Sequence, residues 1–215
     1  MDSKKSLNLL VLGGTGKTGK AIIKFALKAG HKVRSLTRNV DKAPKFQEGN
    51  VEWYQGSVLD KKVLLKVLDG VDGVLSAIGP DGMGATTLYS DSIKVIYEAM
   101  KEKNVKRFLG VTATRESTSF GFLDRQFLKF IISKVLADQA AMEEWMEKQN
   151  DKDIEFTMIR PFRIFEKPFT GKYRVGPADA EPKYKKESHT EDIADFMLKE
   201  FSENKYVNQF VSLSL

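Results

Sequence analysis

Glycine recurs at every third position near the start of the chain, directly after a run of apolar residues. The apolar run covers residues 7–12, and Gly13, Gly16 and Gly19 follow it. A buried strand that leads into a glycine-rich turn at the start of a helix brings free backbone N–H groups and the positive end of the helix dipole to one place, which binds phosphate. We therefore expect Gly13 to allow the tight turn, Gly16 to let a pyrophosphate approach the backbone, and Gly19 to let the helix pack closely on the sheet.

Two other interpretations of this loop stay open. One is an ordinary strand, turn and helix without a ligand, because a glycine triplet alone is weak evidence. The other is a nucleoside triphosphatase loop, since residues 13–18 are close to the pattern G-x-x-x-x-G-K-[ST]. That pattern needs glycine where this chain has Val11, and a related variant needs lysine where it has Leu12. No later strand ends in the Asp-rich sequence that would hold Mg²⁺, so the spacing favours a dinucleotide.

Apolar runs and amphipathic segments alternate along most of the chain. This alternation predicts βαβ units and a parallel, doubly wound sheet, which is a Rossmann-type α/β fold in one domain over residues 1–215. After residue 160, prolines and glycines predict loops over about residues 160–190 on the substrate side, with a short hairpin near 170–176. The predicted strands are 7–12, 32–37, 51–55, 72–77, 105–112, 154–160 and 209–213, and the predicted helices are 17–29, 60–69, 86–103, 122–149 and 190–201.

Composition excludes several classes of protein and of site. The 215 residues suffice for one α/β domain, and the absence of cysteine excludes disulfides, a thiolate nucleophile and a thiolate metal site. The net charge is +6, but the lysines are scattered through predicted helices, so we expect solvated faces and no nucleic-acid partner. His31 and His189 lack companion ligands, so no metal is expected. No run approaches the roughly 18 apolar residues of a membrane span, so we expect a cytoplasmic protein.

The end of the second predicted strand indicates which dinucleotide binds. An NAD site places Asp or Glu there, to accept a hydrogen bond from the ribose 2′-hydroxyl, whereas an NADP site places Arg or Lys against the 2′-phosphate. Here Arg38 follows the strand directly, Lys42 lies four residues further on, and no acid stands at the strand end. A guanidinium grips phosphate through two hydrogen bonds, so we predict NADP(H) as the cofactor.

Motifs over nearly the whole length resemble one known family. They are the glycine loop at 13–19, Arg38, the Gly-x-Val at 56–58, the Pro-Phe-Thr-Gly-Lys-Tyr at 168–173 and the segment 192–198. The chain resembles the NmrA-like group of atypical short-chain dehydrogenases, and within it the biliverdin reductase B (flavin reductase) branch. The resemblance implies a monomeric NADPH-dependent oxidoreductase that transfers hydride to a small planar conjugated acceptor of the flavin, quinone or bilin type.

The resemblance also implies which residues form the site, most of them just after predicted strands. Those expected to bind the cofactor are Gly13, Thr15, Gly16, Lys17, Thr18, Arg38, Lys42, Ser57, Val58, Ala77, Ile78, Gly79, Thr112, Pro161 and Phe162. Those expected to bind the substrate are Thr114, Gln139, Phe162 and Arg163. The chain has Ser57 where the family usually has Asp, and Ala113 where it has Ser. Gln139 and Arg163 replace two histidines of the acceptor pocket.

No catalytic acid emerges from the sequence. Tyr97 and Lys101 form a Tyr-x-x-x-Lys pattern, but they precede the fifth predicted strand, so we interpret Tyr97 as structural. Alcohol–ketone chemistry needs such an acid, whereas a conjugated acceptor delocalises its charge and takes its proton from water. Phe162, together with Phe120, Phe122 and Phe165, is either a stacking platform or core packing. Two alternatives stay open: a non-catalytic NADP(H)-binding sensor of the NmrA type, and an isomerase, epimerase or cyclase.

Overall fold

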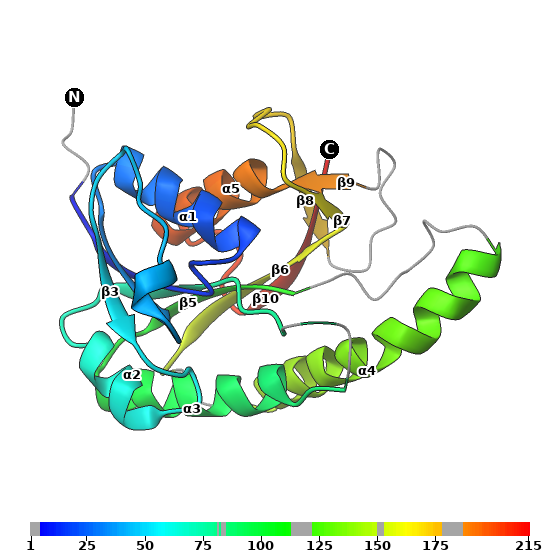
Figure 1. The fold of residues 1–215 in the computed structure, drawn as a ribbon, viewed down its shortest axis with the longest axis horizontal. Coiled ribbons are helices and arrows are strands. Elements are labelled where there is room, and N and C mark those ends of the chain that lie inside the picture. Colours follow the sequence, from blue (N-terminus) through cyan, green and yellow to red (C-terminus); the bar gives the residue numbers. More distant parts are fainter. Residues whose placement is uncertain (1–4, 81, 83–84, 113–121, 150–152, 178–186) are drawn as a thin grey trace.

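The described part of the chain contains ten strands and five α-helices in the computed structural model of this protein (Figure 1). The structure describes residues 5–80, 82, 85–112, 122–149, 153–177 and 187–215, and the side chains of the helix 122–147 only from residue 134 onward. The strands are β1 (Asn8–Leu12), β2 (Lys32–Thr37), β3 (Val51–Gln55), β4 (Gly73–Ser76), β5 (Arg107–Val111), β6 (Glu155–Pro161), β7 (Arg163–Phe165), β8 (Arg174–Pro177), β9 (Glu187–His189) and β10 (Gln209–Ser214). The helices are α1 (Lys17–Lys28), the short 3₁₀ helix η1 (Val40–Lys42), α2 (Lys61–Val67), α3 (Leu88–Glu102), α4 (Phe122–Glu147) and α5 (Thr190–Glu203).

Eight of the strands form one sheet in the order β3-β2-β1-β4-β5-β6-β10-β8. Neighbouring strands are parallel except at the edge, where β8 runs antiparallel to β10. The order reverses at β1, which pairs with β2 on one side and with β4 on the other. This is the predicted Rossmann-type, doubly wound α/β fold, whose ligands lie beyond the carboxyl ends of the strands at the switch point.

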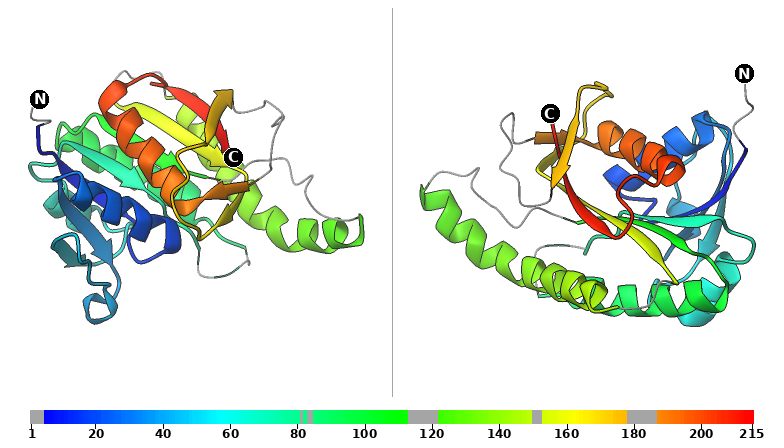
Figure 2. Two further views of the ribbon diagram at one scale, coloured as in Figure 1. Left: turned by 90° about the horizontal axis from the view of Figure 1, so that it is seen from above. Right: turned by 180° about the vertical axis from the view of Figure 1, so that it is seen from behind.

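The helices cover both faces of the sheet (Figures 1 and 2). Helices α1 and α5 lie on one face, and α2, α3 and α4 lie on the other. Side chains of β1 alternate between the two cores because successive residues of a strand point to opposite faces. Leu9 and Val11 pack in the core under α1 and α5, whereas Leu10 and Leu12 pack in the core under α2, α3 and α4. Both faces of β1 are therefore buried, as its continuous apolar run predicts.

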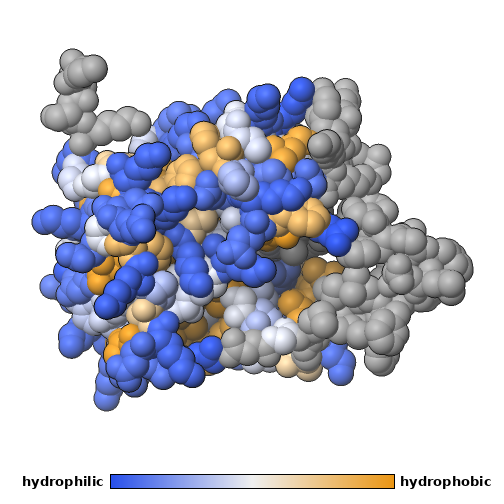
Figure 3. All heavy atoms as spheres, turned by 45° about the horizontal axis from the view of Figure 1, so that its top comes forward, coloured by the Kyte–Doolittle hydropathy of each residue, from blue (hydrophilic) through white to orange (hydrophobic). Residues whose placement is uncertain are grey.

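Hydrophilic side chains cover most of the face that α1 and α5 form, with apolar residues visible between them (Figure 3). Within the described part of the chain, no helix combines the length and the apolar composition that crossing a bilayer requires.

The described part of residues 160–190 differs from the sequence prediction, whereas the helix predicted at 190–201 and the strand predicted at 209–213 are confirmed. The prediction of a hairpin near 170–176 is wrong, because β8 pairs with β10 and not with a strand next to it in the sequence. β7 pairs in parallel with β9, and His189, expected in a loop, is the last residue of β9. Such strands of three or four residues depend on partners distant in the sequence, so local composition does not reveal them.

Candidate functional site

The glycine loop joins β1 to α1 by close backbone contacts. Gly13 has a φ of +76°, and a Cβ there would lie 2.3 Å from the carbonyl oxygen of Ala77. A Cβ at Gly19 would lie 2.1 Å from the carbonyl oxygen of Gly13. The Gly16 N–H donates to that same carbonyl over 3.0 Å. Glycine at positions 13 and 19 therefore lets the chain turn sharply after β1 and lets α1 pack directly against the turn.

The start of α1 offers backbone donors to a ligand. Its N-cap is Gly16, and in this fully described stretch no side chain caps the helix and no acid stands in the first turn. A Cβ at Gly16 would meet a single atom, the carbonyl oxygen of Gly13 at 3.3 Å, so the space beside Gly16 is otherwise open. The first N–H groups of a helix have no partner inside it, and the helix dipole makes this end positive. These features fit the diphosphate of a dinucleotide.

A cleft of about 740 Å³ lies over the carboxyl ends of β1, β2, β3 and β4. Its volume falls within the roughly 300–1,000 Å³ of small-molecule sites. Among the described residues that line it, two are cationic, Arg38 and Lys42, and none is acidic. The lining residues are Gly13, Thr15, Gly16, Leu36, Thr37, Arg38, Asn39, Lys42, Gly56, Ser57, Val58, Leu59, Ala77, Ile78, Gly79, Pro80 and Leu88.

Local hydrogen bonds shape the rim of the cleft that carries the two cations. The Asn39 N–H donates to Thr37 Oγ1 over 3.3 Å, and the Asp41 N–H donates to Asn39 Oδ1 over 2.9 Å. This second bond caps η1, which contains Lys42. Short polar side chains that bond the backbone two residues on stabilise such turns. The turn therefore presents Arg38 and Lys42 on one edge of the cleft.

Most of the residues predicted to bind the cofactor line this cleft, but Lys17 and Thr18 do not. Lys17 Nζ lies 3.3 Å from Glu166 Oε2, and both side chains are more than half exposed. Thr112, Pro161 and Phe162 lie at the ends of β5 and β6 and are not among the described residues that line the cleft. Thr114 and the predicted Phe120 fall outside the described residues, as does the Phe122 side chain. Four residues at the predicted strand ends also line the cleft: Thr37, Asn39, Gly56 and Pro80. The sequence prediction missed the leucines at positions 36, 59 and 88.

A buried polar cluster lies at the carboxyl ends of β5 and β6. Thr112 Oγ1 lies 3.2 Å from Glu143 Oε1, to which it donates. Arg160 donates twice to the same carboxylate, from Nε to Oε1 over 3.0 Å and from Nη2 to Oε2 over 2.8 Å. Thr112, Glu143 and Arg160 are each at most 5% exposed. Sequence reasoning missed Glu143, because a charged residue on an amphipathic helix is normally assigned to the solvent face.

The predicted substrate residues lie in different surroundings. Gln139 is buried between α3 and α4, and its Oε1 has no hydrogen-bond partner among the described residues. It contacts Tyr89, whose pKa is raised because burial outweighs the hydrogen bond from Gln139. Phe162 is also buried, and its N–H donates to Ser188 Oγ over 3.1 Å. Arg163 is exposed on β7, with its guanidinium 5.1 Å from the ring centroid of Phe165.

Tyr97 lies in the core and not in the cleft. It is 2% exposed, and its ring makes edge contacts with Trp145 at 5.3 Å and Phe108 at 5.8 Å. Among the described residues its hydroxyl has no hydrogen-bond partner, and burial raises its pKa. Tyr97 is therefore a packing residue. In the described part of the chain, no three His, Cys, Asp or Glu side chains gather as a group that could hold a metal ion.

Comparisons with known proteins place the chain among dinucleotide-binding proteins. A family described as NAD(P)H-binding matches residues 13–204. An isoflavone reductase homolog from Arabidopsis thaliana is 32% identical over 129 residues, which cover 54% of this chain and 39% of that protein. The chain spans less than half the length of the curated relatives it matches.

Solved structures match over nearly the full length. A proposed NADH-flavin reductase from Streptococcus pneumoniae has a TM-score of 0.78 and 20% identity, covering 97% of this chain and 99% of the other. An anaerobilin reductase from Escherichia coli O157:H7 has a TM-score of 0.74 and 16% identity, covering 96% of both chains. At these identities the matches show the shared fold.

Proposed function

Since this chain belongs to the NAD(P)H-binding family, we propose that it is a reductase that uses NADPH to reduce a planar conjugated acceptor of the flavin, quinone or bilin type. Its cofactor is a nicotinamide dinucleotide. When bound, the cofactor would supply a hydride, which carries two electrons, and the acceptor would take one proton from water. The acceptor is a small molecule, and we place the reaction in the cytoplasm, with a monomeric enzyme.

The charge of the cleft carries the preference for NADPH over NADH. The 2′-phosphate of NADPH is anionic, and the described lining of the cleft contains the cationic Arg38 and Lys42 and no acidic residue. An NAD site would instead place an acid at the end of β2 to bind the free 2′-hydroxyl. The backbone N–H groups at the start of α1 bind the diphosphate, which places the adenosine half toward β2 and β3.

The absence of a conventional acid supports a conjugated acceptor. The only Tyr-x-x-x-Lys tyrosine of the sequence, Tyr97, is buried in the core against Phe108 and Trp145 and is not among the described residues that line the cleft. Reduction of a flavin or bilin needs orientation against the nicotinamide more than it needs a protein acid. The names of the two structural neighbours, a flavin reductase and a bilin reductase, favour the same class.

The remaining predicted residues complete the proposed site. Thr112, Pro161 and Phe162 flank the nicotinamide, and the segment 160–190 forms the substrate side. Thr114, Gln139 and Arg163 contact the acceptor, where the exposed guanidinium of Arg163 attracts a phosphate or carboxylate substituent.

The test is the loss of NADPH absorbance with FMN as the acceptor, run beside NADH. Arg38→Glu should weaken NADPH binding by about 100-fold or more, because it removes a charge-assisted contact and adds repulsion, and should leave NADH binding nearly unchanged. Lys45→Glu is the matched control, because it makes the same charge change on an exposed residue that does not line the cleft.

Each outcome decides one part of the proposal. Rapid NADPH-selective turnover that Arg38→Glu abolishes and Lys45→Glu preserves supports the reductase and the 2′-phosphate contact together. An equal loss of both cofactors in Arg38→Glu contradicts the 2′-phosphate contact. NADPH binding without turnover on flavins, quinones or bilins contradicts the reductase and favours a non-catalytic sensor.

A further inference from the structure

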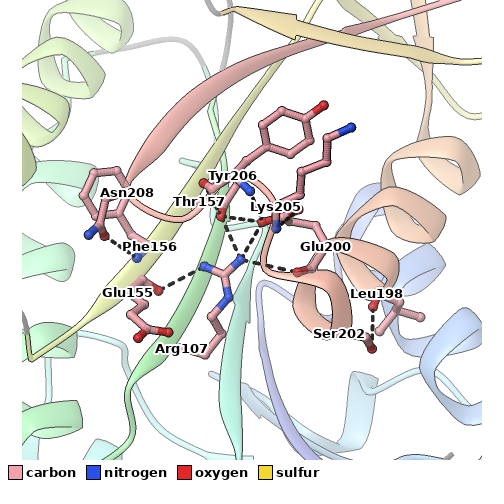
Figure 4. Close-up of polar contacts among 10 residues, drawn as sticks. All are labelled: Arg107, Glu155, Phe156, Thr157, Leu198, Glu200, Ser202, Lys205, Tyr206 and Asn208. Carbon is pink, nitrogen blue, oxygen red and sulfur yellow. Dashed lines mark hydrogen bonds and ion pairs between the residues drawn. The ribbon is translucent and has the colours of Figure 1, made fainter.

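Strands β5 and β6 carry a buried Arg–Glu–Thr triad at each end. The amino-end triad consists of Arg107, Thr157 and Glu200 (Figure 4). Arg107 Nη2 lies 2.8 Å from Glu200 Oε1 and 2.8 Å from Thr157 Oγ1, and Thr157 Oγ1 lies 3.2 Å from Glu200 Oε1. Glu200 also accepts the backbone N–H groups of Lys205 and Tyr206, so this triad holds the turn after α5.

The carboxyl-end triad consists of Thr112, Glu143 and Arg160. It contains the same three residue types, but here the carboxylate accepts two bonds from the guanidinium, at 2.8 and 3.0 Å, and one from the threonine hydroxyl at 3.2 Å. The Arg160 guanidinium also lies 4.6 Å from the ring centroid of Phe210. The position of this triad differs from that of the amino-end triad, because Thr112 directly follows β5 on the ligand side of the sheet.

Stability alone does not explain the carboxyl-end triad. Taking two charges out of water costs about as much as their attraction returns, so well-packed apolar residues of similar volume are as stabilising as a buried ion pair. The amino-end triad has a structural use, in the turn after α5. The ion pair of Glu143 and Arg160 is buried on the ligand side of the same two strands, which points to a role in the binding site.

The order of the strands places the reacting half of the cofactor over this triad. With the diphosphate held at the start of α1, after β1, the adenosine half would lie toward β2 and Arg38. The other half would then lie toward β4 and β5, on the opposite side of β1 in the strand order. Strands lie about 4.8 Å apart, so the end of β5 is about 10 Å from the end of β1, within reach of the nicotinamide nucleoside.

We propose that Glu143 and Arg160 are positioning residues for hydride transfer and act through the hydroxyl of Thr112, an inference that rests on the proposed reductase function. The Thr112 hydroxyl has Glu143 Oε1 as an acceptor at 3.2 Å and the carbonyl oxygen of Ile159 at 3.4 Å, and Glu143 is the nearer and the charged one. With its hydrogen directed to these acceptors, Thr112 Oγ1 presents a lone pair, which fits the N–H of a carboxamide. Arg160 neutralises Glu143, so the carboxylate does not repel the negative charge that develops on the acceptor as the hydride arrives. The triad therefore sets both the orientation of the donor and the local charge.

The experiment compares matched substitutions in the two triads. Thr112→Val removes the hydroxyl with little change in volume, Thr112→Ser keeps it, and Thr157→Val is the control at the amino end. Glu143→Gln and Glu200→Gln form a second matched pair. Three quantities are measured on each variant: the thermal unfolding temperature, the Kd of NADPH with the emission lifetime of its bound nicotinamide, and turnover with FMN.

Substitutions in both triads should lower the unfolding temperature. Only Thr112→Val should shorten the nicotinamide lifetime and reduce kcat by about tenfold or more, the effect of one lost positioning hydrogen bond. Glu143→Gln keeps an oxygen that accepts from Thr112 but leaves the Arg160 cation without its counter-charge, so it should change kcat, whereas Glu200→Gln should not. The NADPH Kd of Thr112→Val and Glu143→Gln should change by less than about threefold, since the diphosphate and 2′-phosphate contacts remain. Thr112→Ser should restore the lifetime and kcat.

The proposal is overturned if Thr112→Val and Thr157→Val have the same nicotinamide lifetime and the same kcat. If Glu143→Gln does not fold, the Thr112→Val and Thr112→Ser pair decides, because both keep the buried ion pair. A wild-type protein without turnover would refute the reductase function and not the positioning role, which the lifetimes still test.

Discussion

Alanine substitutions at two glycines of the phosphate loop should separate the folding of the loop from its use. At Gly19 an added Cβ would lie 2.1 Å from the carbonyl oxygen of Gly13 and 2.9 Å from the Cα of Gly14. Backbone atoms cannot rotate away, so α1 must shift by more than about 1 Å to reach an ordinary contact of about 3.5 Å. Overpacking of this kind costs about 1–3 kcal/mol. At about 2–4 °C per kcal/mol, Gly19→Ala should lower the unfolding temperature by roughly 2–12 °C.

Gly16→Ala should behave in the opposite way. Its backbone has an ordinary φ of −77°, and the added Cβ would meet one atom at 3.3 Å. The cost of alanine at an N-cap is partly offset by the reduced freedom of the unfolded chain, so the net change should stay within about 1 kcal/mol. The methyl group would stand in the cleft, and losing one charge-assisted hydrogen bond to the diphosphate costs about 1.5–3 kcal/mol. NADPH should therefore bind roughly 10- to 150-fold more weakly.

The assay measures two quantities on the same variants: NADPH affinity by fluorescence titration, and thermal unfolding by circular dichroism. Gly16→Ala should lose affinity and keep most of its stability, whereas Gly19→Ala should lose stability. Wild-type NADPH affinity in Gly16→Ala would refute the approach of the diphosphate at that residue. A wild-type unfolding temperature in Gly19→Ala would refute the close contact between α1 and the turn.

Three further predictions concern groups outside the cleft. Glu200→Gln leaves the buried Arg107 cation without its counter-charge and should cost about 3–5 kcal/mol in urea unfolding; a loss below about 1 kcal/mol would contradict the pairing. Tyr97→Phe removes a buried hydroxyl without a described partner, so the unfolding temperature should stay equal or rise, and turnover should persist; a dead enzyme would place Tyr97 in the site. Burial raises the pKa of the Glu191 carboxyl, but hydrogen bonds from Lys24 and a backbone N–H outweigh it and bring the pKa below its ordinary 4.5. The ionised Glu191 carboxylate therefore stabilises the fold fully above pH 4.5, and this stabilisation is lost as the pH falls through the pKa of the folded state. Glu191→Gln should make the unfolding free energy less dependent on pH in this acid range. An unchanged acid dependence would show that another group causes it.

The first half of the fold follows from local sequence patterns. The predicted strands at 32–37 and 51–55 have the observed bounds of β2 and β3, and the predicted helix at 17–29 ends one residue beyond α1. These elements have strong periodicity, and glycines separate them, so local preference and tertiary packing agree. For the same reason the residues after β1, β2, β3 and β4 could be named as one site before the sheet was known, since the carboxyl ends of parallel strands meet at one edge.

The short strands between residues 160 and 190 could not be predicted in this way. β7, β8 and β9 are three or four residues long, and each is a strand because of a partner elsewhere in the chain. The same holds for individual side chains. Lys17 follows the glycine loop in sequence, but its ammonium group pairs with Glu166, which approaches only in the folded chain.

The sequence by itself determined the doubly wound sheet, the glycine loop and the cationic edge at Arg38, because each depends on residues that are neighbours in the chain. Tertiary structure alone decided that Glu143 of α4 and Arg160 of β6 meet under Thr112, and that Glu200 of α5 meets Arg107 at the opposite end of β5. A charged residue on an amphipathic helix is normally solvated, and its burial is stable only where the fold supplies the opposite charge and enough hydrogen bonds. That pairing joins positions 17 and 93 residues apart, and no local pattern records it.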